Sequence, residues 1–164
     1  MKKRSLVFPA RFLQTVTVLA GMGALALLLW EPHIEGRNAH ATIFEIYFKD
    51  PFLAYAYSAS LPFFMALYQA FKVLGYIGEG KPFLPATVKA FGTIKVCAFA
   101  LIGFVVVGEL FIMLGDSDDR AGGVFIGLLI AFGSLVIAAA AAMLERTFGN
   151  AADMKTISPR SSLE

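Results

Sequence analysis

The sequence has 164 residues, of which 58% are hydrophobic and only 16% are charged. Soluble domains are about 45–50% apolar and about 25% charged, so a chain of this length could not bury the excess, and we expect an integral membrane protein. The net charge is only +2 and no run of Lys and Arg alternates with aromatic residues, which argues against a nucleic-acid partner. The single cysteine, Cys97, excludes an internal disulfide.

Four apolar segments have the length of a membrane-crossing helix. They cover approximately residues 12–30, 51–77, 90–114 and 122–144. About 20 helical residues cross a hydrocarbon layer of about 30 Å, whereas a barrel strand needs only about 9–11 residues with alternating polarity. The sequence therefore predicts an all-α integral membrane fold, a four-transmembrane-helix bundle. We expect one domain, residues 1–149, followed by a flexible cytoplasmic tail, residues 150–164, whose last residues resemble a cloning remnant.

The first apolar segment also resembles a secretory signal peptide, because it follows the basic residues Lys2, Lys3 and Arg4. A small-x-small cleavage pattern is present at residues 39–41. However, the apolar run is longer than a signal core of about 7–15 residues, and that pattern lies well beyond the end of the run. We therefore expect the first segment to be retained as a span.

The segment after the first span contains residue types that bind zinc or copper. These are Glu31, His33, Glu35 and His40. Neither HxxxH nor HExxH is present, and Pro32 and Gly36 argue against a helix that would organise the histidines. The favoured interpretation is a solvated loop, with metal ligation as the weaker alternative, and no cofactor is expected.

The same segment ends in a capping box, Thr42-Ile-Phe-Glu45, which predicts a short helix over about 43–49. This helix would be apolar around most of its circumference and would lie in the membrane interface. Simple anchoring is the favoured role, and a lid over an outward-facing pocket is the alternative.

Charge predicts the orientation of the spans. Of the 14 Lys and Arg residues, all but Arg37, Lys49 and Arg120 lie on one side of the array. The positive-inside rule then places both termini and the 78–89 loop in the cytoplasm of a bacterial inner membrane. Lys95 and Glu145 lie near the inner ends of spans three and four, so we expect a structural Lys–Glu network there.

Glu109 is the candidate functional residue inside the membrane. It lies in the third span among apolar residues. A carboxylate facing lipid would be costly, so Glu109 should face other helices, be protonated, or both. A proton relay, a cation site and a polar lock between helices are all consistent with the sequence, and periodicity names no partner. Because Glu109 lies close to the outer end of the span, where water or headgroups can reach it, a structural role is the favoured one and a functional role the alternative.

Small residues mark faces where helices pack. Gly123 and Gly127 form a GxxxG pattern in the fourth span, followed by the alanine run 138–142. Such residues let neighbouring helices approach closely. The pattern predicts that the fourth span is central in the bundle or else forms the contact of a homo-oligomer.

Three stretches carry a family resemblance: "EPHIEGRNAHATIFEIYFKDPFLAYAY", "GKPFLPATVKAFGTIK" and "AAAAAMLERTFGNAADMK". With the four spans, they resemble a bacterial family of four-helix inner-membrane proteins classed as a domain of unknown function. The resemblance implies a gene neighbourhood with a helix-turn-helix transcription regulator, and hence a regulatory partner. Family members end in an "ENDLTV"-like tail, whereas this chain ends in "TISPRSSLE". The resemblance assigns no functional residues.

Three functions remain open on the sequence. The favoured one is a non-enzymatic regulatory or sensory membrane protein that contacts membrane lipids and a cytoplasmic regulator through residues 78–89 and the tail. The alternative is a small transporter or channel component that handles a cation or proton through Glu109. An intramembrane enzyme is disfavoured, because the sequence shows no paired nucleophile and base.

Overall fold

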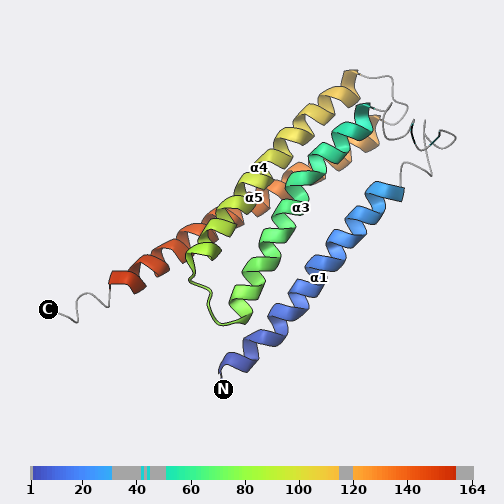
Figure 1. Ribbon diagram of the computed structural model, residues 1–164. Helices are drawn as coiled ribbons and strands as arrows, with labels where there is room; N and C mark the ends of the chain where they lie inside the picture. Colours follow the sequence, from blue (N-terminus) through green and yellow to red (C-terminus); the bar gives the residue numbers. More distant parts are fainter. Residues whose placement is uncertain (1, 31–41, 43, 45–50, 115–119, 158–164) are drawn as a thin grey trace.

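The computed structural model describes residues 2–30, 42, 44, 51–114 and 120–157. Within these residues lie four long helices, α1 (Lys2–Trp30), α3 (Pro51–Gly78), α4 (Pro85–Leu114) and α5 (Arg120–Ile157), shown in Figure 1. All four are long and apolar enough to cross a membrane. The predicted all-α fold with four spans is therefore confirmed.

Two helices extend further than the hydropathy pattern predicted. α1 starts at Lys2, before the expected start of the span at residue 12, and α5 continues to Ile157. Residues 150–157, which the sequence assigned to a flexible tail, are thus helical. The 38 residues of α5 measure about 57 Å at 1.5 Å per residue, well beyond a hydrocarbon layer of about 30 Å. We call the end of the array that carries Lys2, Ile157 and the 79–84 connection the termini end. The opposite end, where α1 ends and α5 begins, is called the loop end.

The helices pack mainly against their neighbours in the sequence: α1 against α3, α3 against α4, and α4 against α5. The inner helices are therefore α3 and α4, while α1 and α5 flank them (Figure 1). The sequence predicted that the fourth span is either central or the contact of a homo-oligomer. The central position is wrong, because α5 packs chiefly on α4. The contact of a homo-oligomer stays a prediction.

Polar side chains join α1 to α3 at two levels. The Gln14 side-chain amide donates to the carbonyl oxygen of Phe71 at 3.1 Å. Near the loop end, the Tyr57 hydroxyl donates to the carbonyl oxygen of Leu28 at 3.0 Å. Because lipid cannot replace such hydrogen bonds, they favour the docked position of α1.

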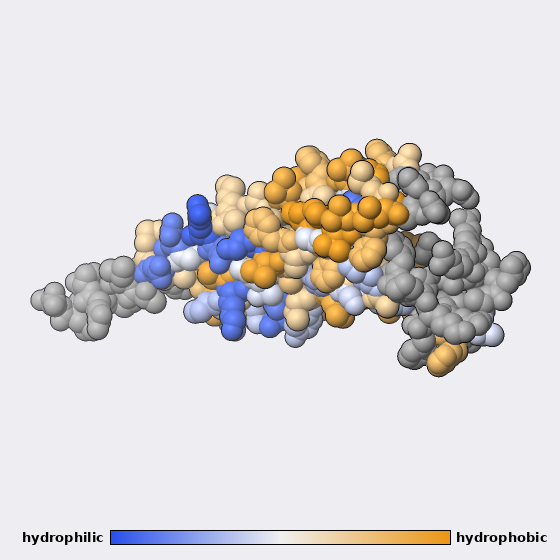
Figure 2. All heavy atoms as spheres, turned by 90° about the horizontal axis from the view of Figure 1, so that it is seen from above, coloured by the Kyte–Doolittle hydropathy of each residue, from blue (hydrophilic) through white to orange (hydrophobic). Residues whose placement is uncertain are grey.

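The core lies towards the termini end, where α3, α4 and α5 meet. It consists of Val73, Ala90, Phe91, Ile94 and Ala141. Large apolar side chains elsewhere on the helices are mostly exposed. Figure 2 shows this distribution: hydrophobic residues form a broad region on the visible face, and hydrophilic residues gather towards the termini end. This is the surface expected of a protein whose apolar exterior faces lipid.

Candidate functional site

The candidate metal ligands of the first inter-span segment, Glu31, His33, Glu35 and His40, lie outside the described residues. The short helix expected over 43–49 also lies outside them, except for Phe44, which is helical. In the parts of the chain that the structure describes, no three His, Cys, Asp or Glu residues are placed to hold a metal ion together.

Glu109 lies near the loop end of α4 and is half-buried. Its Oε2 atom is buried and has no hydrogen-bond partner within the described part of the chain. Burial of a carboxyl oxygen without a partner costs free energy, whichever protonation state it has. The structure therefore contains an unsatisfied acid inside a candidate membrane span.

The Glu109 side chain is directed at Gly127 of α5. A methyl group added to Gly127 would lie 2.8 Å from Cδ of Glu109, closer still to Oε1, and 3.4 Å from Cγ1 of Val105. The carboxyl group thus occupies the space that any larger residue at position 127 would need. One turn earlier on α5, Gly123 leaves room for the side chain of Ile112. A methyl group added to Gly123 would lie 3.1 Å from Cδ1 of Ile112. The GxxxG pattern therefore receives two side chains of α4.

Tyr55 of α3 holds the same part of α4 from the other side. Its hydroxyl donates to the carbonyl oxygen of Phe104, and its ring packs beside Gly108, where an added methyl group would lie 3.4 Å from Cε1. The ring also lies 5.6 Å from that of Phe104 and 5.8 Å from that of Phe111, between centroids. Since Glu109 directly follows Gly108, Tyr55 packs on α4 beside the residue whose side chain is directed at α5.

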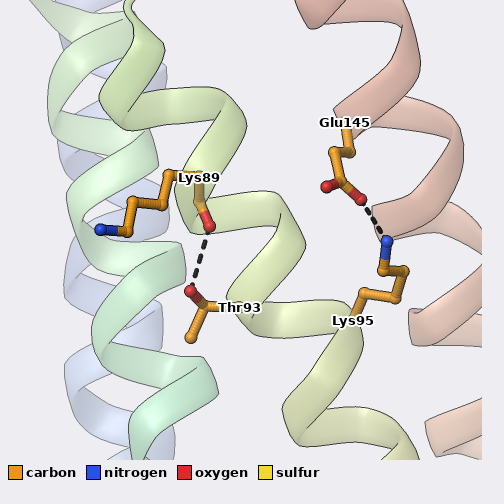
Figure 3. A network of polar contacts seen from close by, with 4 residues as sticks. All are labelled: Lys89, Thr93, Lys95 and Glu145. Atoms are coloured by element: carbon orange, nitrogen blue, oxygen red, sulfur yellow. Dashed lines mark hydrogen bonds and ion pairs between the residues drawn. The ribbon is translucent and has the colours of Figure 1, made fainter.

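The other end of the α4–α5 contact contains a paired acid. Lys95 donates to Oε2 of Glu145 at 2.6 Å, and the two side chains are 32% and 29% exposed (Figure 3). A methyl group at Gly92 would lie 2.8 Å from Oε1 of Glu145. The predicted Lys–Glu network is confirmed for this pair. Each helix thus places one glutamate over a glycine of the other helix; within the described residues, Glu145 forms an ion pair and Glu109 does not.

Between these two acids the α4–α5 pair is almost entirely apolar. Residues 96–108 of α4 and 128–144 of α5 carry only two side chains with a polar or thiol group, Cys97 and Ser134. Both are buried. These two segments of α4 and α5 therefore carry no series of polar side chains that would connect Glu109 with Glu145.

At the termini end, the 79–84 connection, which lies within the predicted partner-binding loop 78–89, packs on the part of α5 that precedes the predicted tail. The ring of Phe148 on α5 lies 5.5 Å from that of Phe83 in the 79–84 connection and 5.4 Å from that of Phe91 on α4. Next to it, a methyl group at Gly149 would lie 3.8 Å from Val88. α5 around Phe148 thus packs on the 79–84 connection and on the first turns of α4.

Sequence reasoning identified Glu109, Gly123 and Gly127 but did not pair them. It assigned Tyr55 only to the aromatic belt and so missed its contact with α4. The useful signal was the spacing from each residue to the loop that joins the helices. In an antiparallel pair, positions at similar distances from the connection meet, as Glu109 and Gly127 do.

This fold defines a membrane protein with four candidate spans, and the third contains an acid whose Oε2 atom has no hydrogen-bond partner among the described residues. Residues 37–156 match the family described as a protein of unknown function, DUF2975, and the chain belongs to that family. It is similar to the uncharacterized membrane protein YoaS of Bacillus subtilis (strain 168), with 37% identity over 147 residues, covering 88% of this chain and 92% of the relative. No solved structure matches the chain.

Proposed function

We propose that this protein is a non-enzymatic sensory protein of the bacterial inner membrane, with both termini in the cytoplasm. In this proposal, Glu109 takes up and releases a proton, and the packing of α4 against α5 differs between the two protonation states. The observation that carries the proposal is the buried Oε2 atom of Glu109, which has no partner among the described residues. An ionisable residue inside a membrane span is a functional-site hypothesis by default.

A proton fits this site better than a metal ion does. Hard cations such as Ca²⁺ and Mg²⁺ take about six to eight oxygen ligands. The described residues contain no cluster of acidic, His or Cys side chains that could supply such a set. A proton needs a single carboxyl group, and the chemistry of Glu109 is sufficient for it.

Packing supports transmission of a change from Glu109 to the termini end. The Glu109 carboxyl group lies against Gly127 of α5. More than five turns later on the same helix, Phe148 packs on Phe83 and Phe91. A shift of α5 at Gly127 would therefore move the surface formed by the 79–84 connection and the end of α5. We propose that this surface contacts a cytoplasmic transcription regulator.

Transport of a proton or cation through Glu109 is the second candidate function. The same unpaired carboxyl group favours it. Against it stands the apolar stretch between Glu109 and Glu145, because proton relays use successive polar groups and only Cys97 and Ser134 lie in these segments. Sensing therefore ranks above transport.

The test compares a distance at the termini end between the two protonation states of Glu109. Spin labels at positions 81 and 154, where Lys81 and Met154 are exposed, report the distance between the connection and the end of α5. The labels are placed in a Cys97→Ala background and measured at acidic and neutral pH. We expect the distance distribution to change with pH in the parent protein and to stay constant in Glu109→Gln.

Gly133→Ala serves as the control variant, because a methyl group there meets nothing within 4 Å. It should retain the full pH response. A response that persists in Glu109→Gln would refute the sensory proposal. Proton flux into vesicles that is present in the parent protein and lost in Glu109→Gln would establish transport instead.

A further inference from the structure

Two lysines near the termini end of the inner helices have no acidic partner within the described residues. Lys72 lies on α3, with its Nζ atom 5.4 Å from the centroid of the Tyr68 ring. Lys89 lies on α4 and is exposed. Figure 3 shows that Lys89 points away from α5, whereas Lys95 points towards Glu145. These two cations are therefore available to a ligand outside the helix array.

Lys72 and Lys89 lie near the same end of the α3–α4 pair, because Lys72 is six residues before the end of α3 and Lys89 is four residues after the start of α4. Their neighbours in the sequence, Val73 and Ala90, belong to the same buried cluster. A helix turns about 100° per residue, so a residue next to a core position emerges beside the core rather than in it. The contacts of Phe71 with α1 and of Lys95 with α5 lie on other sides of the two helices. Lys72 and Lys89 thus flank the face of α3 and α4 that neither flanking helix covers.

Exposed apolar residues continue from each lysine towards the loop end. On α3, Tyr68, Met65 and Leu61 follow Lys72 at helical spacing and are 58%, 50% and 68% exposed. On α4, Val96 lies seven residues after Lys89 and is 63% exposed. Further along α4, a methyl group at Gly103 would meet nothing within 4 Å.

We infer that this face binds a phospholipid whose headgroup carries a net negative charge. Lys72 and Lys89 would bind the headgroup phosphate, and an acyl chain would lie along the apolar rows beneath them. Basic pairs between membrane helices are known to recruit anionic headgroups. The apolar rows favour a lipid over free phosphate, which would use the lysines alone.

The test measures the affinity of the detergent-purified protein for phosphatidylglycerol and phosphatidylcholine by native mass spectrometry. The variant is Lys72→Gln with Lys89→Gln. The control, Lys3→Gln with Lys81→Gln, removes the same charge from the same end, and Lys81 is already paired with Glu79 at 3.7 Å. A basic residue near an anionic surface contributes roughly fivefold to affinity, so the variant should bind phosphatidylglycerol roughly 25-fold more weakly and the control nearly normally.

Equal phosphatidylglycerol affinity in the variant and its control would overturn the inference, as would equal binding of the two lipids by the parent protein. Lys72→Arg with Lys89→Arg should restore affinity if the charges themselves act. A photoactivatable phosphatidylglycerol gives a second readout on the unaltered protein. It should label the peptides that contain Met65 and Val96, and labelling confined to α1 or α5 would contradict the assignment.

Discussion

Replacement of Gly127 by alanine tests whether the Glu109 carboxyl group is seated against α5. The added methyl group would lie 2.8 Å from Cδ of Glu109, which is shorter than any ordinary carbon–carbon contact. The Glu109 side chain must then leave its position. By contrast, alanine at Gly133 on the same helix meets nothing within 4 Å. The two substitutions add the same methyl group and differ only in what it contacts.

The magnitude follows from two opposing contributions. Glycine to alanine in a helix stabilises by up to about 1 kcal/mol, and both variants share this gain. Overpacking costs about 1–3 kcal/mol, and only Gly127→Ala incurs it. We therefore expect Gly127→Ala to be less stable than Gly133→Ala by about 1–3 kcal/mol. In a Glu109→Ala background the difference should nearly vanish, because the displaced group is absent.

The free energy of unfolding can be measured by denaturation in detergent micelles, with helicity as the signal. The four proteins of the double-mutant cycle, with and without Gly127→Ala and Glu109→Ala, isolate the coupling between the two positions. A coupling energy near zero would refute the reasoning, as would equal stabilities of Gly127→Ala and Gly133→Ala.

Three further predictions concern the remaining contacts. Glu145→Gln should lower the free energy of unfolding by about 1–2 kcal/mol, a value between those for exposed and buried ion pairs. The double variant Lys95→Glu with Glu145→Lys should recover part of this loss, and no loss in Glu145→Gln would show that the pair is dispensable. Tyr55→Phe should lower the free energy of unfolding by about 0.6–1 kcal/mol, because the hydrogen bond of Tyr55 to α4 is lost. A thermal unfolding transition equal to that of the parent protein would contradict a stabilising role for this hydrogen bond. Phe148→Ala should lower the free energy of unfolding by about 3 kcal/mol, because its ring contacts are lost. Amide hydrogen exchange at the end of α5 should become faster, and unchanged exchange would contradict the packing.

Hydropathy predicted the four spans because the membrane thickness imposes a length on every crossing helix. It did not predict the ends of α1 and α5, since Lys2 and Ile157 lie beyond the apolar segments, where no comparable length constraint acts. The central place assigned to α5 was wrong for a different reason. Small residues show that a helix packs closely, but not against how many neighbours.

The pairing at the candidate site depends on tertiary register. The sequence identifies Glu109 as an acid in an apolar run, and Gly127 as part of a GxxxG pattern. Their contact depends on the rotation of α4, which is packed between α5 and Tyr55 of α3 at this level. Periodicity within one helix cannot report such a relation, because the deciding contacts come from two other helices.

The proposal that Glu109 exchanges a proton is tested most directly by infrared difference spectroscopy between acidic and neutral pH. The parent protein and Gly133→Ala should show the carbonyl band of a protonated carboxyl group in apolar surroundings, and Glu109→Gln should lack it. Difference spectra that are identical in the parent protein and Glu109→Gln would contradict the account.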